Sequence, residues 1–305
     1  MASATEEETG APEETLAWEG RQRRPSAIAA IVAGLLLIGS RILSSTSLAD
    51  VPTVGVLDGL RDALGRPLSG GGEGLLTPTV LFFDDKATEI LLFAVMEALA
   101  FVGIGVFLGF LYRAVKWRNP RFTRLALIVS LVAAGLYAVG VLVLQVGIVS
   151  AASDFAAGGD RSTAAAHDAI SGGSLVAGQA LVEIGRLLLG LGIILIALNA
   201  MRVGLLTRFL GILGIIAGLL FILPLGVQFI VQSFWLVAAG VLVLREGTPA
   251  WRKGVAVPWP SQQSLREARE ADSGAAAGGS RVPVPGPEAP ETPEAAARRR
   301  KRKRR

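Results

Sequence analysis

Long apolar runs that carry almost no charge constrain this chain more than any other feature. Several of them exceed the ~18 residues that mark a membrane span. A soluble protein of 305 residues would instead form about two domains, with helices of about 11–12 residues. Only 18% of the residues are charged, against about 25% in soluble proteins. The sequence therefore predicts a polytopic membrane protein and argues against a soluble enzyme.

The apolar runs predict an all-α fold, a bundle of six transmembrane helices within a membrane domain of residues 25–245. The last two spans come from one stretch, 209–244, which is too long for a single helix and which Pro224 and Gly226 interrupt near its middle. The expected spans are 27–43, 90–112, 125–149, 175–198, 207–223 and 226–244.

The first span is the weakest of the six, because Arg41 interrupts it near its far end. An arginine there can extend its charged group to the membrane interface. A signal peptide is the alternative, since Ser47-Leu48-Ala49 resembles a cleavage site of small residues. The long acidic segment before the apolar run favours an uncleaved span.

Polar segments of disordered composition flank the membrane domain. Residues 1–24 hold six acidic and three basic groups, and residues 246–305 are rich in Pro, Ala, Gly and Glu. Eight basic residues end the chain: Arg298, Arg299, Arg300, Lys301, Arg302, Lys303, Arg304 and Arg305. Such clusters bind anionic lipid. Nucleic acid or an acidic protein fits the same electrostatics, although the basic charge belongs to the tail rather than to a nucleic-acid-binding domain. A solvated tail that only helps to set topology is an equal alternative.

The distribution of lysine and arginine predicts the orientation in the membrane. One set of span ends carries thirteen such residues: Arg21, Arg23, Arg24, Arg113, Lys116, Arg118, Arg121, Arg124, Arg202, Arg208, Arg245, Arg252 and Lys253. The other set carries five, spread over longer loops: Arg41, Arg61, Arg66, Lys86 and Arg161. The side richer in basic residues faces the cytoplasm. We therefore expect both termini on the cytoplasmic side of a bacterial cell membrane.

Ionisable residues are scarce inside the spans, and a charge at bilayer depth costs about 2.5–3.5 kcal/mol unless it is paired or hydrated. Glu97 lies in the second span, and Glu183 and Arg186 share a helix face in the fourth. Gln179 lies on the same helix face as Glu183 and Arg186, and Gln145, Gln228 and Gln232 fall in the outer half of their spans. The favoured hypothesis is a structural clasp in which Arg186 bridges Glu183 and Glu97. The alternative is a substrate or proton site of a transporter.

Small residues predict where the helices pack closely. Glycines recur every seven residues or as G-x-x-x-G, spacings that let helix backbones approach each other. The candidate packing glycines are Gly105, Gly109, Gly178, Gly185, Gly192, Gly211, Gly214 and Gly218.

Residue types for catalysis or metal binding are few. The chain has no cysteine and one histidine, His167, so thiolate sites and sites of several histidines are excluded. His167 and Asp168 lack a nucleophile motif, which favours a solvated loop histidine. We expect no enzymatic activity, no metal and no cofactor. The leading hypothesis is a membrane structural or interaction protein, with a small transporter or proton-linked carrier as the alternative.

Three patterns near the C-terminal spans carry a resemblance to known proteins. They are Ala197-Leu198-Asn199-Ala200-Met201-Arg202, Leu205-Leu206-Thr207-Arg208-Phe209-Leu210-Gly211 and Gln232-Ser233-Phe234-Trp235-Leu236. Together with the composition and the basic tail, they look like uncharacterised multi-pass membrane proteins of actinobacteria. The resemblance covers residues 25–250 and implies a class of unknown function, with no catalytic residues.

Overall fold

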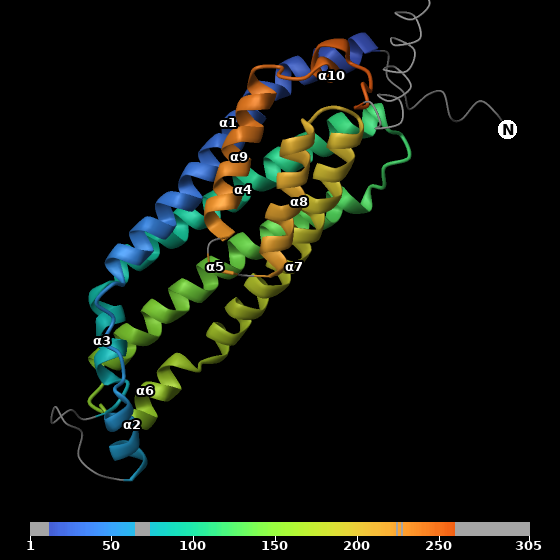
Figure 1. The fold of residues 1–305 in the computed structure, drawn as a ribbon. Helices are drawn as coiled ribbons and strands as arrows, with labels where there is room; N and C mark the ends of the chain where they lie inside the picture. The colour runs from blue at the N-terminus through green and yellow to red at the C-terminus, as the bar shows by residue number, and fades with distance from the viewer. Residues whose placement is uncertain (1–11, 65–73, 224, 227, 260–305) are drawn as a thin grey trace, which may run out of the picture. The chain divides into compact units, whose positions relative to one another are not determined.

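The computed structural model describes residues 12–64, 74–223, 225–226 and 228–259. Within these residues the chain forms helices and no strand, so the all-α prediction is confirmed for this part (Figure 1). The helices are α1 (Pro12–Ser47), α2 (Val56–Ala63), α3 (Thr77–Asp85), α4 (Ala87–Arg118), α5 (Leu125–Ala157), α6 (Thr163–Ile170), α7 (Gly173–Arg202), α8 (Arg208–Ile222), α9 (Gln228–Leu244) and α10 (Pro249–Lys253).

Five of the helical segments are long and apolar enough to cross a membrane. They are α1, α4, α5, α7 and the segment that begins with α9. Helix α8 is apolar but has 15 residues, or about 22 Å at the rise of an α-helix, which is less than the ~30 Å of a bilayer core. The predicted count of six full spans is therefore not confirmed.

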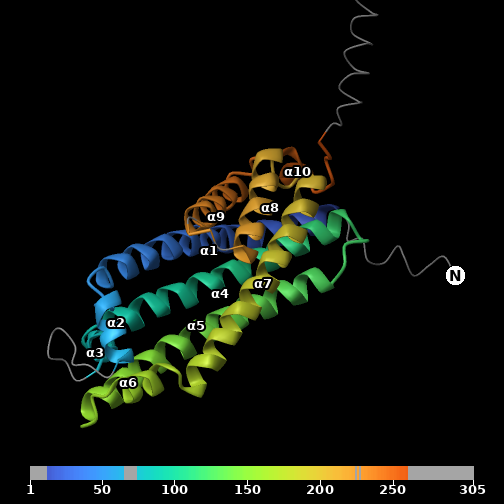
Figure 2. The ribbon, with the colours of Figure 1, turned by 60° about the horizontal axis from the view of Figure 1, so that its bottom comes forward.

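The long helices and the α8–α9 hairpin form a ring. Each of α1, α4, α5, α7, α8 and α9 contacts the next, and α9 returns to contact α1. Figures 1 and 2 show α8 and α9 alongside only one part of the longer helices, which extend past the tip of the hairpin. The hairpin therefore ends partway along the bundle.

Apolar side chains point both into the bundle and away from it. On α4, Phe101 and Ile104 are buried, whereas Leu99 and Val102 are about half exposed. A helix that is hydrophobic on all sides is typical of a membrane span or of the centre of a large protein. Because these exposed faces have no protein cover, the helices fit a membrane protein.

The candidate packing glycines lie at helix–helix contacts. A Cβ on Gly185 of α7 would lie 2.7 Å from the backbone nitrogen of Tyr137 on α5, and one on Gly218 of α8 would lie 2.7 Å from the carbonyl oxygen of Gly190. The same crowding occurs at Gly178, Gly192, Gly211 and Gly214. Gly105 and Gly109 are less crowded, with nearest atoms at 3.2 and 3.7 Å. Among the candidate glycines, the close contacts are with backbone at Gly178, Gly185 and Gly218, and with side chains at Gly192, Gly211 and Gly214.

A small second cluster of apolar residues lies beyond the hairpin tip. It joins α3, α5 and α6 through Val80, Ala152, Phe155 and Ala166. Thr77 supports it by donating a hydrogen bond from Oγ1 to the carbonyl oxygen of Arg161 at 2.8 Å. The two long connections therefore form a helical cap in the part that the structure describes.

The parts of the two predicted tails that lie within the described residues are more ordered than their composition predicts. Residues 12–24 belong to α1, which corrects that part of the expected disordered segment 1–24. Residues 246–259 also pack against the bundle, because Trp251 is buried and donates to the carbonyl oxygen of Leu205 at 2.9 Å. Trp259 donates to the carbonyl oxygen of Leu206 at 3.0 Å. The rest of the two predicted tails, with the basic cluster 298–305, lies outside the described residues.

Candidate functional site

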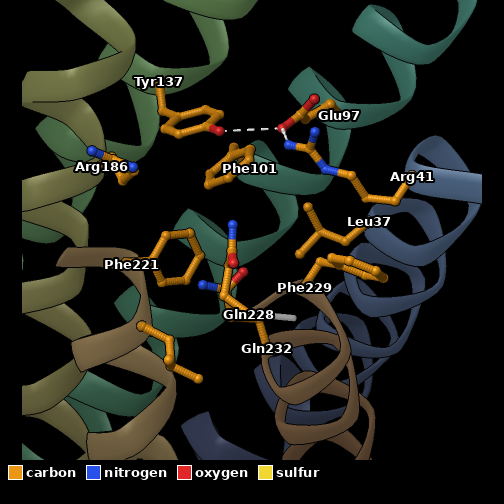
Figure 3. A pocket seen from close by; sticks show the side chains of 11 residues that line it. Leu37, Arg41, Glu97, Phe101, Tyr137, Arg186, Phe221, Gln228, Phe229 and Gln232 are labelled. Atoms are coloured by element: carbon orange, nitrogen blue, oxygen red, sulfur yellow. Dashed lines mark hydrogen bonds and ion pairs between the residues drawn. The ribbon is translucent and has the colours of Figure 1, made fainter. Parts of the chain in front are cut away.

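A small polar cavity lies at the tip of the α8–α9 hairpin (Figure 3). Its volume is about 40 Å³. One water molecule needs roughly 10–15 Å³ on this measure, so about three fit. All six helices of the ring contribute to the lining, which consists of Leu37, Arg41, Glu97, Phe101, Tyr137, Arg186, Leu220, Phe221, Gln228, Phe229 and Gln232.

The break between α8 and α9 brings the hairpin to this position. Helix α8 ends at Ile222 and α9 begins at Gln228. Gly226 between them has a φ of 82°, a conformation that glycine adopts without steric cost. Since the hairpin turns back partway along the longer helices, the first turn of α9 faces Glu97 and Arg186 across the cavity.

Glu97 forms one wall of the cavity with Arg41 and Tyr137. Arg41 donates from Nη2 to Oε1 of Glu97 at 2.6 Å, and the Tyr137 hydroxyl donates to the same oxygen at 3.2 Å. The Glu97 side chain is only 6% exposed, whereas that of Arg41 is 44% exposed. Phe101 stacks on Tyr137 with ring centroids 3.7 Å apart. These contacts join α1, α4 and α5.

This arrangement differs from the predicted clasp. We expected Arg186 to bridge Glu183 and Glu97, but the cationic partner of Glu97 is Arg41, from α1. Arg186 instead donates from Nη2 to Glu183, three residues earlier on its own helix. The bridge to Glu97 is absent from the ion pairs of the described residues, because each glutamate has a nearer arginine.

The polar residues predicted to converge fall into two groups. Glu97, Arg186, Gln228 and Gln232 line the cavity. Gln145, Gln179 and Glu183 do not line it. Gln179 donates to Oε1 of Glu183 at 3.0 Å. Gln179, Glu183 and Arg186 therefore follow one another along α7, and only Arg186 reaches the cavity. Gln145 is half-buried on α5.

Two residues of the site, Arg41 and Tyr137, were not among the predicted cluster. Arg41 carried a signal, because it is a charge in an apolar run at a depth similar to that of Glu97. Tyr137 offered a weaker indication, because it and Ser130 are the two residues with a hydroxyl group in the apolar span 125–149.

Three buried polar atoms of the lining have no hydrogen-bond partner within the described part of the chain: Nε of Arg186, Oε1 of Gln228 and Nε2 of Gln232. Figure 3 shows the two glutamines extending from α9 between Phe221 and Phe229. A buried polar group that stays unpaired costs about 1–3 kcal/mol. The cavity is therefore suited to water or to a solute that supplies the missing partners.

The described residues contain no group of three or more His, Cys, Asp and Glu side chains that could hold a metal ion. His167, the single histidine of the chain, lies on the short helix α6, away from the residues that line the cavity.

Residues 79–248, more than half of the chain, match the model of a family described as a domain of unknown function, DUF4386. The match includes Glu97, Tyr137, Arg186 and both glutamines of the cavity, and it leaves out Arg41. No curated protein and no solved structure matches the chain.

Proposed function

Because the chain belongs to the DUF4386 family, whose description names no activity, we propose a function from the cavity itself. The protein is a non-catalytic membrane protein that binds a small polar solute between α4, α7 and the tip of the α8–α9 hairpin. The supporting observation is the set of unpartnered buried atoms on Arg186, Gln228 and Gln232. Side chains that only held the helices together would not need these unpaired atoms, because each unpaired atom destabilises the protein when no solute is bound.

The two walls of the cavity differ in how their polar groups are paired. Arg41, Glu97 and Tyr137 hold the long helices together and are paired with one another. Arg186, Gln228 and Gln232 each carry a buried polar atom without a hydrogen-bond partner in the described part of the chain, and a solute would supply that partner. Binding rather than catalysis is favoured, because the described residues of the lining include one carboxylate, on Glu97, and no histidine, lysine or serine to act with it in proton transfer or nucleophilic attack.

Transport is the second candidate, and the shape of the hairpin favours it. Both α8 and α9 end at the cavity, partway along the bundle. Discontinuous helices that end at a site inside the membrane are typical of carriers. Uptake of a bound solute into proteoliposomes would distinguish a carrier from a protein that only binds.

Binding is tested by replacing Gln232 with leucine, which has a similar size and no polar atoms. We expect at least one class among halides, short carboxylates, amides, alcohols and alkali cations to raise the melting temperature of the detergent-solubilised protein. The rise follows from binding to the folded state alone. Gln232→Leu should lose it and, without solute, melt at or above the wild-type temperature.

Ile230→Leu is the matched control, because Ile230 is exposed on the same helix. It should respond to the solute as the wild type does. No response to any class, or equal responses in Gln232→Leu and wild type, would contradict a binding site.

We also propose that both termini face the cytoplasm and that the protein lies in a bacterial cell membrane, with actinobacteria as the source that its Ala-, Gly- and Arg-rich composition favours. The thirteen basic residues at one end of the ring support this orientation. The C-terminal cluster 298–305 would then contact anionic lipid on the inner surface.

Single cysteines test the orientation, because the native chain has none. Gly159 and Arg121 are exposed in connections at opposite ends of the long helices. In intact cells, Gly159→Cys should react with a membrane-impermeant maleimide, and Arg121→Cys should react only after lysis. The reverse labelling pattern would invert the topology.

A further inference from the structure

We infer that the solute of the cavity is a small monovalent anion, of the size of a halide or of formate. This inference rests on the proposed function and specifies the substrate class of the same site. It follows from the charge of the lining, from the kind of polar atom left unpaired and from the volume.

The charged groups of the lining favour an anion. Two guanidinium groups, on Arg41 and Arg186, face the cavity together with one carboxylate, on Glu97. Arg41 and Tyr137 both hydrogen-bond that carboxylate, so its charge is compensated on its own wall. The groups that face the cavity therefore carry one more positive charge than negative. Arg186 is paired with Glu183 on its own helix, but Glu183 lies outside the lining.

The unpaired atoms are suited to hold an anion by donating hydrogen bonds. Nε of Arg186 and Nε2 of Gln232 are N–H donors, and Gln232 is only 5% exposed. Oε1 of Gln228 is an acceptor, but the amide oxygen and nitrogen exchange places when the group flips, so this side chain can donate as well. Hydrogen bonds from a guanidinium to an anion are about twice as strong as those between neutral groups.

The first turn of α9 adds to the same potential. Gln228 and Phe229 belong to that turn and line the cavity. The first N–H groups of a helix lack intrahelical partners and lie at the positive end of its dipole. The unpartnered donor of Gln232, one turn further along, lies on the same side of the helix as Gln228.

The volume sets an upper limit on the anion. A cavity of about 40 Å³ is enclosed partly by Leu37, Phe101, Phe221 and Phe229. A halide or formate replaces about one to three water molecules and fits this space. Phosphate esters, sugars and lipid headgroups are too large.

The test compares anions at constant ionic strength with the purified full-length chain in detergent. Sodium bromide, chloride or formate replaces sodium gluconate, whose anion exceeds the cavity. We expect a saturable rise in the melting temperature with the small anions. Arg186→Gln should weaken the apparent affinity by roughly tenfold or more, since a charge-assisted hydrogen bond is lost. Arg202→Gln, an exposed position at the other end of α7, should keep the wild-type affinity.

A second variant keeps the test decisive if Arg186→Gln does not fold. Glu183→Gln removes the charge that competes for Arg186 and should bind bromide at least as tightly as the wild type. Weaker binding in Glu183→Gln, or an equal halide effect in wild type and Arg186→Gln, would overturn the anion assignment. If only a neutral solute or a cation stabilises the wild type, the anion assignment fails and the proposed binding function stands. If no solute does, both fail.

Discussion

Replacement of Arg118 by leucine is expected to cause the largest loss of stability in the described bundle. The side chains of Arg118 and Glu19 are 0% and 2% exposed, and two hydrogen bonds join them. Arg118 also donates from Nη2 to the carbonyl oxygen of Ala250 at 2.9 Å. One guanidinium therefore ties α1 and α10 to the end of α4. Removing it leaves a buried carboxylate without its cation, which costs about 3–5 kcal/mol.

A loss of that size corresponds to a fall in the melting temperature on the order of 10 °C, read from the unfolding of the detergent-solubilised protein. Arg121→Leu, at an exposed position in the connection that follows α4, should leave the melting temperature nearly unchanged. Arg118→Lys should recover little, because an ammonium group cannot reproduce the bidentate contact.

The double variant Glu19→Leu/Arg118→Leu separates the ion pair from simple packing. Removing both partners leaves no unpaired charge, so the double variant should be more stable than Arg118→Leu alone. If the single and double variants melt at the same temperature, the two side chains do not stabilise each other in the way that their contacts indicate.

The sequence contained no sign of this contact, and the reason is general. Arg118 and Glu19 are 99 residues apart, so no local spacing connects them. The acidic composition of residues 1–24 predicted disorder, but an average over a segment hides a few side chains that bury well. Trp18 stacks on Phe110, with ring centroids 5.5 Å apart. Trp251, in the predicted C-terminal tail, is also buried and also stacks on Phe110.

The long helices, by contrast, were predictable, because the hydropathy of a segment depends only on the residues within that segment. Hydropathy located α1, α4, α5 and α7, and the break at Pro224 and Gly226 located the α8–α9 hairpin. Counting residues along each span also placed Glu97 and Glu183 at a similar depth, with Arg186 about one turn deeper. Glu97 and Arg186 line the cavity, and Glu183 does not.

Which side chains pair with each other at the depth of the cavity was not predictable from the sequence. Residue counting gives the depth of a side chain, but it gives neither the order of the helices around the bundle nor the rotation of each helix about its axis. Helix α1 packs beside α4, which brings Arg41 to Glu97. The i,i+3 spacing of Glu183 and Arg186 is local, and that ion pair forms as expected on α7.

The second large effect is expected at this site, where Arg41→Leu should destabilise the protein far more than Arg186→Leu. Without Arg41, the carboxylate of Glu97 is 6% exposed and keeps only the Tyr137 hydroxyl at 3.2 Å. The cost approaches the ~3 kcal/mol of a buried pair that has lost one member. Without Arg186, Glu183 keeps the hydrogen bond from Gln179, and protein leaves 40% of its side chain uncovered, so the expected loss is smaller than at Glu97.

The melting temperatures of these two variants in detergent measure the difference, and the double variant Arg41→Leu/Glu97→Leu supplies the control. It should recover much of the stability lost in Arg41→Leu, because breaking a buried pair costs more than removing it. Tyr137→Phe should cost about 1 kcal/mol, the value of one hydrogen bond. If Arg186→Leu proved the more damaging single change, Arg186 rather than Arg41 would be the residue that neutralises Glu97. The guanidinium of Arg186 would then not be available to a solute, and the binding proposal would lose its positive charge.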